Sequence, residues 1–212
     1  MKTASEFWDA AAEKYAKSTI DDMDGYTYTL DRTKSYLKTT DRALEVGCGT
    51  GSTALLLAPS VKHITGTDVS GNMIRIANEK ADKEGAKNVS FAALDVFDDS
   101  QDQGPYDVVL AHNLLHLLED IPAALNRVNG LLKPGGLFIS KTFCQDGGKL
   151  TFKMRLMMMA LPLAQMLGKA PFVNFMSIKE LEGMISNHGF EIIETGNYPA
   201  TASGRYIVAR KS

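Results

Sequence analysis

The strongest constraint on the fold is an apolar strand pattern that runs directly into a glycine-rich turn, ALEVGCGTG, at residues 43–51. A helical pattern, STALLL, follows at residues 52–57. Glycine lacks a Cβ atom, so it can adopt positive φ and lets a ligand lie against the backbone. The free N–H groups at the start of the next helix favour an anionic group. This run therefore predicts a ligand site where a strand ends and a helix begins.

A second strand pattern, at residues 63–68, ends in an acidic residue, Asp68. A carboxylate at the end of the neighbouring parallel strand can accept hydrogen bonds from a ribose. The spacing G-x-G-x-G from Gly47 to Gly51 differs from the dinucleotide fingerprint G-x-G-x-x-G, whose last glycine serves helix–strand packing. We therefore expect an adenosine-containing ligand and argue against a nicotinamide dinucleotide.

The motifs resemble those of the class I S-adenosylmethionine (SAM)-dependent methyltransferases, whose first motif is (D/E)-x-G-x-G-x-G. Here Glu45 stands two residues before the first glycine. The later motifs of that family follow in order, at residues 68–73, 89–96, 106–113 and 131–140. The resemblance implies SAM as the cofactor, S-adenosylhomocysteine (SAH) as its product, and methyl transfer as the activity.

Strand and helix patterns alternate from Arg42 onward, which predicts an α/β fold with a parallel sheet covered by helices on both faces. The resemblance implies a Rossmann-like three-layer sandwich with a seven-stranded, mostly parallel sheet. Its last strand would be antiparallel, with the patterns at 191–195 and 205–209 forming the closing pair. Helices are expected at 70–85, where a glycine ends the pattern, and at 121–132, where a proline follows the first residue.

The chain is long enough for one sizeable core, so we expect a single methyltransferase domain at 1–212. Its expected parts are a helical cap at 1–40, a cofactor-binding core at 41–145, an apolar helical insertion or lid at 146–176, and a C-terminal helix with a strand pair at 177–212. Within the cap, Ser5 is expected to begin a helix over 5–18. A polar link at 22–28 and a helix at 30–37 would follow.

The segment 147–175 is dense in apolar residues and in methionine. Its apolar run is too short and too interrupted to span a membrane. Three interpretations stay open: a core helix, a lid over an apolar substrate pocket, or a surface that docks on a membrane or a partner. Methionine adapts to irregular apolar shapes, and four basic residues would suit anionic lipid headgroups, namely Lys149, Lys153, Arg155 and Lys169.

The resemblance also implies which residues contact the cofactor. They are Tyr15, Glu45, Gly47, Cys48, Gly49, Gly51, Asp68, Val69, Met73, Asp95, Val96 and His112. The glycines would approach the methionine part, and Glu45 would organise their loop and meet the amino group through water. Asp68 would accept from both ribose hydroxyls. Val69 and Met73 would enclose the adenine, and Asp95 would accept from its amino group.

The candidate catalytic residues are His112 and His116, which follow the fourth strand pattern. In each case a plainer role competes: a pocket wall for His112, and a hydrogen-bonded packing residue among leucines for His116. Tyr26 and Tyr28 are further pocket candidates. An O–H or N⁺–H acceptor requires a base, whereas an activated carbon or a thiolate has different needs, so no general base is assigned.

Composition and motifs limit the partners. The 23 basic and 25 acidic residues give a net charge of −2, which argues against a broad nucleic-acid-binding face. The fourth motif also lacks the N/D-P-P-Y/F pattern of DNA adenine methylases. Cys48 and Cys144 have no zinc-ligand spacing, and the histidines form no cluster, so no metal is expected. No signal-peptide or disulfide pattern is present, which favours the cytoplasm.

Together these patterns predict a SAM-dependent methyltransferase whose acceptor is a small, partly apolar molecule. Quinone-like, lipid-like and secondary-metabolite acceptors are compatible with the sequence. The alternatives are a non-catalytic SAM-binding subunit and a methyltransferase that acts on RNA or protein. No transmembrane segment is expected, peripheral membrane contact stays open, and the sequence does not indicate the oligomeric state.

Overall fold

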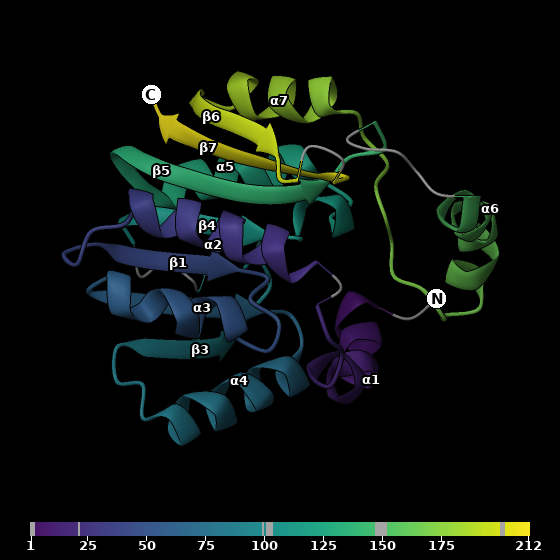
Figure 1. Cartoon of the computed structure of the whole chain (residues 1–212), viewed down its shortest axis with the longest axis horizontal. Coiled ribbons are helices and arrows are strands. Elements are labelled where there is room, and N and C mark those ends of the chain that lie inside the picture. Colours follow the sequence, from purple (N-terminus) through teal and green to yellow (C-terminus); the bar gives the residue numbers. More distant parts are fainter. Residues whose placement is uncertain (1–2, 21, 99, 101–103, 147–151, 200–201) are drawn as a thin grey trace.

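The computed structural model describes residues 3–212 except 21, 99, 101–103, 147–151 and 200–201. A seven-stranded sheet, in the order β3-β2-β1-β4-β5-β7-β6, forms its centre (Figure 1). The strands are β1 (Arg42–Val46), β2 (His63–Asp68), β3 (Val89–Ala93), β4 (Tyr106–His112), β5 (Leu132–Phe143), β6 (Phe190–Asn197) and β7 (Gly204–Lys211). The helices are α1 (Ala4–Ala16), α2 (Met23–Tyr36), α3 (Ser52–Leu57), α4 (Gly71–Glu84), α5 (Ile121–Leu131), α6 (Phe152–Met166) and α7 (Ile178–Asn187).

The strand directions confirm the predicted sheet. Strands β3, β2, β1, β4 and β5 pair in parallel, whereas β7 lies antiparallel between β5 and β6. Parallel strands need crossover connections, and α3 lies between β1 and β2, α4 between β2 and β3, and α5 between β4 and β5. The carboxyl ends of the parallel strands therefore meet along one edge of the sheet, which is the edge where ligands bind in open α/β folds.

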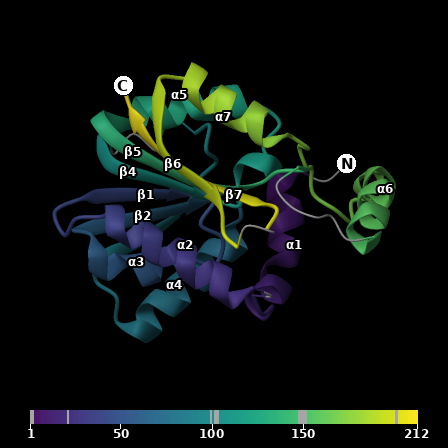
Figure 2. The ribbon, with the colours of Figure 1, turned by 45° about the horizontal axis from the view of Figure 1, so that its top comes forward.

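Two apolar cores hold the three layers together. On one face, Leu125 of α5 and Leu181 of α7 are fully buried against the sheet. On the other face, Leu57 of α3 is fully buried and Leu30 of α2 is nearly so. Figure 2 shows α5 and α7 on one side of the sheet and α2, α3 and α4 on the other. This arrangement confirms the predicted Rossmann-like sandwich.

The start of the N-terminal helix differs from the prediction. Thr3, not Ser5, caps α1: its hydroxyl accepts the Glu6 N–H at 3.2 Å, and the Glu6 carboxylate accepts the Thr3 N–H at 2.9 Å. This reciprocal capping box requires Glu or Gln three residues after the cap. Ser5 has Trp8 in that position, so only Thr3 can form the box.

The predicted polar link at 22–28 is wrong, because α2 covers Met23–Tyr36 in one continuous helix. Asp22 caps it by accepting the Gly25 N–H at 2.9 Å. A side chain at Gly25 would come within 2.9 Å of the Tyr198 carbonyl oxygen, so the glycine allows close packing of the helix. Gly25, which is typical of a loop in the sequence, is instead required by this tertiary contact.

The methionine-rich insertion forms α6, which stands apart from the sheet in both views (Figures 1 and 2). Several of its large apolar side chains are exposed, by 59% at Leu156, 81% at Met159 and 67% at Met166. This exposure excludes the core-helix interpretation for these side chains. No helix among the residues with a described position has the length and apolar character needed to cross a membrane.

The segment after α6 returns to the main body of the protein. The Asn174 N–H donates to the His116 carbonyl oxygen at 2.6 Å, and the Gln145 N–H donates to that of Met176 at 3.0 Å. The ring of Phe175 lies edge-on to that of Phe143, with centroids 6.5 Å apart. The insertion is therefore attached beside the carboxyl ends of β4 and β5.

Candidate functional site

The glycine turn connects β1 to α3 with three residues at positive φ, Gly47 at 67°, Gly49 at 53° and Gly51 at 74°. A Cβ at Gly49 would meet only a ring carbon of Tyr15 at 3.8 Å, so the backbone there faces open space. A Cβ at Gly51 would lie 2.6 Å from Phe91. Gly51 therefore serves the packing of α3, and its predicted contact with the cofactor is not supported.

A pocket of about 450 Å³ opens at the carboxyl ends of β1, β2 and β4. It is lined by most of the predicted cofactor residues: Tyr15, Glu45, Gly47, Cys48, Gly49, Asp68, Val69, Met73, Asp95, Val96 and His112. Gly51 and His116 do not line it. Tyr26 also faces the pocket, whereas Tyr28 lies outside, with its ring 4.6 Å from that of Tyr198.

Several further side chains complete the lining without having been predicted. They include Trp8, Ile20, Asp22, Thr50, Ser52, Thr53, Lys80, Leu94, Leu114, Leu117, Leu118 and Lys141. Asp22 was missed because its helix was taken for a link. Lys141 could have been predicted from the sequence. A polar residue near the end of the strand that pairs with β4 must lie at the same sheet edge as His112.

Asp68 connects the glycine turn to the start of α4. Its Oδ2 accepts the Gly49 N–H and its Oδ1 accepts the Ser70 N–H, both at 2.9 Å. Burial raises the pKa of Asp68, and these two hydrogen bonds oppose the rise. Each carboxylate oxygen has two lone pairs, so both can still accept from a ligand hydroxyl. The carboxylate is therefore fixed in place with spare acceptor capacity toward the pocket.

Glu45 lines the pocket and has a buried carboxylate oxygen. The residue is 2% exposed, and its Oε1 lies 3.4 Å from Nδ1 of His112. Its Oε2 is buried with no hydrogen-bond partner among the described residues. An unsatisfied buried carboxylate oxygen is destabilising. A cationic donor in the pocket, such as the ammonium group of SAM, would satisfy it, so the residues present fit this cofactor.

His116 lies beside the pocket, in the short 3-10 helix η3 (Leu115–Leu117). Its Nδ1 is buried without a partner in the described part of the chain. Burial lowers the pKa of His116 to about 4, so the imidazole is neutral near pH 7. Its ring centroid is 6.2 Å from that of Phe143. The structure therefore gives His116 a packed, uncharged environment rather than contact with the pocket.

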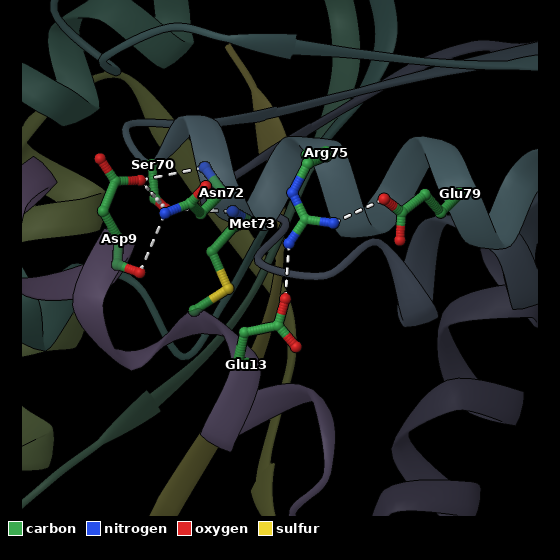
Figure 3. Close-up of polar contacts among 7 residues, drawn as sticks. All are labelled: Asp9, Glu13, Ser70, Asn72, Met73, Arg75 and Glu79. Carbon is green, nitrogen blue, oxygen red and sulfur yellow. Dashed lines mark hydrogen bonds and ion pairs between the residues drawn. The ribbon is translucent and has the colours of Figure 1, made fainter.

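Helix α1 covers the pocket from the side of α4, and Figure 3 shows the polar contacts that hold it there. The Asp9 carboxylate accepts from the Ser70 hydroxyl at 2.6 Å and from the Asn72 N–H at 3.0 Å. These hydrogen bonds lower the pKa of Asp9. Glu13 pairs with Arg75 at 2.6 Å. Tyr15 and Trp8, which line the pocket, are thereby positioned over it.

The comparison with protein families identifies the family to which the chain belongs. A family model described as a methyltransferase domain matches residues 21–195. The chain belongs to this methyltransferase family.

The curated relatives are much larger proteins. The chain is 38% identical over 102 residues to the reducing polyketide synthase Preu2 of Preussia isomera, and 31% identical over 139 residues to the highly reducing polyketide synthase AFT9-1 of Alternaria alternata. These alignments cover 45% and 60% of this chain. The chain spans only 4% of the length of each of these two relatives.

Solved structures share the fold at low identity. A magnesium protoporphyrin IX methyltransferase from Synechocystis PCC 6803 with bound SAH has a TM-score of 0.71 at 18% identity, covering 98% of this chain and 97% of that one. A SAM-dependent methyltransferase from Methanosarcina mazei has a TM-score of 0.66 at 21% identity, covering 85% and 96%. At these identities the structures support the fold alone.

Proposed function

We propose that the protein transfers the methyl group of SAM to a small, partly apolar acceptor. The observation that carries this proposal is a single pocket in which the predicted cofactor residues meet an apolar wall. Leu114, Leu117, Leu118 and Ile20 contribute apolar side chains to that wall. The similarity to polyketide synthases supports an acceptor of the secondary-metabolite type.

The residues around the glycine turn would hold the cofactor in a defined orientation. We assign the ribose hydroxyls to Asp68 and the adenine to the pocket end around Val69, Met73 and Asp95. Glu45 would accept directly from the ammonium group, because its Oε2 lacks a partner among the described residues. When bound, SAM supplies a methyl group that is already activated as a sulfonium. The protein mainly has to align donor and acceptor.

His112 is the better of the two catalytic candidates. His112 lines the pocket and contacts Glu45, which orients its ring, whereas His116 neither lines the pocket nor contacts Glu45. A neutral imidazole in this position can take a proton from an acceptor that must lose one. We also place the protein in the cytoplasm, since Cys48 and Cys144 are both buried free thiols.

The insertion at 146–176 is proposed as a lid over the acceptor end of the pocket. Its returning segment contacts His116 and Phe143, next to the wall residue Leu117. None of the described α6 residues lines the pocket, so closure would require α6 to move toward it. Four apolar side chains are available for that contact: Leu156, Met159, Leu163 and Met166.

Calorimetry of the purified chain with SAM, SAH and NAD tests the cofactor assignment. We expect both sulfur compounds to bind and NAD not to bind. Asp68→Ala should weaken SAH binding by about 100-fold, because two hydrogen bonds to a charged acceptor are lost. The exposed Asp82→Ala is the control and should bind normally. An unchanged SAH affinity in Asp68→Ala would contradict the site.

Turnover then tests the acceptor class. The purified chain is incubated with SAM and a panel of apolar phenols, quinones and lipids, and methylated products are detected by mass spectrometry. Product from any of them supports the proposal. Transfer only to RNA or protein, or binding of SAM without transfer to any acceptor, would overturn it.

A further inference from the structure

Three ionisable side chains form a row across one face of the sheet at its carboxyl edge. Glu45 on β1, His112 on β4 and Lys141 on β5 all line the pocket. His112 and Lys141 are directly paired in the sheet. Side chains alternate along a strand, so Lys141 shares its face with Ile139, and His112 shares its face with Leu110. Both of those apolar residues belong to the core under α2 and α3.

Lys141 differs from the other members of the row because nothing close satisfies its charge. Its Nζ has no hydrogen bond or ion pair within the described part of the chain. Glu45 and His112 face each other at 3.4 Å instead. Burial lowers the pKa of Lys141, and the more distant Asp22 opposes this shift. A half-buried ammonium in this state favours an anionic ligand.

Lys80, the other lysine of the pocket, does not share this property. Its Nζ donates to the hydroxyls of Thr50 and Ser52 at 2.8 and 2.9 Å. It therefore braces the glycine turn and the start of α3 on the cofactor side. Of the pocket-lining lysines that the structure describes, Lys141 is the one available to a ligand.

The backbone and stem of Lys141 are held in place by two neighbours. Its carbonyl oxygen accepts the Asn113 N–H at 2.7 Å, which ties the end of β5 to the turn after β4. A Cβ on Gly204 would lie 3.1 Å from Cε of Lys141, so this glycine leaves room for the lysine stem on β7. The ammonium group is therefore presented at a defined place on the pocket wall.

Its position places Lys141 on the acceptor side. The glycine turn follows β1, and the strands that carry Asp68 and precede Asp95 lie on the far side of β1 from β5. Because neighbouring strands are about 4.8 Å apart, Lys141 stands roughly 10 Å from β1. Asp22 and Tyr26, at the start of α2, line the same pocket as Lys141.

We propose that Lys141 is an acceptor-binding residue that pairs with an anionic oxygen of the methyl acceptor, such as a phenolate, enolate or carboxylate. This inference rests on the proposed function and specifies its substrate class. An acceptor bound as an anion by Lys141 is already deprotonated, which removes the need for a strong general base in the pocket. That agrees with the neutral, packed state of His116.

The test uses 4-nitrophenol as the probe, in the presence of saturating SAH. Its phenolate absorbs visible light, so the titration of the bound probe can be followed directly. We expect the native complex to bind the phenolate and to shift its ionisation to lower pH. Lys141→Met should abolish that shift and weaken phenolate binding by about tenfold, the value of one lost charge-assisted hydrogen bond. Lys141→Arg should retain most of both effects.

Two matched variants separate a local from a general effect of charge. Lys87→Met removes an exposed lysine outside the pocket and should leave the probe titration unchanged. Asp22→Asn keeps an acceptor for the Gly25 N–H and removes the opposing charge, so phenolate binding should tighten. Benzoate and benzamide form a second pair of probes, because only benzoate carries the anionic oxygen.

The outcomes are distinguishable from a failure of the proposed function. If the native chain does not bind SAH, both the proposed function and this inference are overturned. Normal SAH binding, with equal probe titration in native and Lys141→Met chains, would overturn the inference alone. If Lys141→Met weakened SAH binding and left benzoate and nitrophenolate binding unchanged, Lys141 would hold the cofactor carboxylate instead. SAH binding by Lys141→Met equal to the native value also shows that the variant is folded.

Discussion

Two carboxylates line the proposed cofactor end of the pocket, the buried Glu45 and the half-buried Asp68, and they differ in how far their hydrogen-bonding capacity is satisfied. Asp68 accepts two backbone N–H groups, which fix its orientation. Glu45 has one weak contact with His112 and one oxygen without a partner among the described residues. The two carboxylates should therefore contribute differently to ligand affinity. Only Glu45 has a buried oxygen that gains its first hydrogen bond when a cationic group binds.

The Glu45 carboxylate should therefore discriminate ligands by their amino group. We expect Glu45→Gln to weaken SAH binding by about tenfold, because a charge-assisted hydrogen bond becomes a neutral one. Binding of 5′-methylthioadenosine, which lacks the amino-acid part, should stay within about twofold, since no ammonium is present to lose that bond. Calorimetry with both ligands measures the difference. Equal losses for the two would indicate that Glu45 only supports the fold of the glycine turn.

At the scale of elements, the pocket depends on how α1 is held against α4. Ala12 of α1 is fully buried, and Met73 of α4 is 2% exposed in the same small cluster. The polar contacts of Asp9 and Glu13 lie near Met73 of this cluster (Figure 3). The exposed pair of Glu13 and Arg75 contributes little on its own. Asp9, which accepts two hydrogen bonds at the start of α4, is the more important contact.

Loosening α1 should weaken cofactor binding without unfolding the domain. We expect Asp9→Ala to reduce SAH affinity by about fivefold, because two hydrogen bonds of moderate strength are lost. Hydrogen exchange in α1 should accelerate, while that of β1 stays slow. Glu79→Ala is the matched control, since Glu79 pairs only with Arg75 of its own helix among the contacts drawn in Figure 3. Exchange in α1 that stays at the native rate would show that Asp9 is dispensable.

Acid should release the same contact. The pKa of Asp9 is lowered in the folded protein, so its contribution is present above its ordinary pKa of 3.8 and is lost as the pH falls through the lowered value. We expect α1 protection to decrease below about pH 4 in the native chain. In Asp9→Asn that pH dependence should be reduced. Exchange measured at matched intrinsic rates across this range provides the readout.

Helix α6 lies outside both apolar cores, and its substitutions should reflect this. We expect Met159→Gln and Leu163→Gln, at 81% and 58% exposure, to change the free energy of unfolding by no more than about 0.5 kcal/mol. The buried Leu181→Ala in α7 should cost about 2–5 kcal/mol. Urea unfolding compares the three. Comparable destabilisation by all three would mean that α6 packs against the body in solution.

For the whole molecule, cofactor binding and folding are linked because the pocket collects residues from distant parts of the chain. Tyr15, Glu45, Asp68 and His112 come from four separate elements or their ends. A ligand that binds only the folded state stabilises it by RT ln(1 + [L]/Kd), about 2.7 kcal/mol at one hundred times Kd. For a domain of this length, that corresponds to a rise in Tm of about 5–10 °C.

Thermal unfolding with SAH at one hundred times its Kd should show this rise. NAD at the same concentration should leave Tm unchanged, because the pocket has no dinucleotide fingerprint. Asp68→Ala, with its weaker affinity, should show a smaller rise at the same SAH concentration. A rise with NAD equal to that with SAH would argue against selective recognition of SAM and SAH.

Much of this architecture could be read from local patterns. The strand–turn–helix at Gly49, the capped helix that ends at Gly85 and the last two strands all lie where the sequence predicts, while the antiparallel pairing of those strands was implied by the family resemblance. Buried strands and helix caps depend on nearest-neighbour chemistry and on periodic apolar residues. Asp68 was predicted for the same reason, since it ends a strand at the ligand-binding edge, whereas Glu45 was implied by the resemblance to the family's first motif.

Tertiary contacts decided the rest. Gly51 serves packing against Phe91, and Gly25 brings α2 close to residue 198, although both glycines resembled local signals. Lys141 reached the pocket because β5 pairs with β4 and Gly204 leaves space for its stem. The exposure of α6 could not be predicted from sequence periodicity either, since an apolar helix is buried only if another surface covers it. Patterns along the chain predict elements and strand ends, whereas packing between distant segments determines which side chains meet.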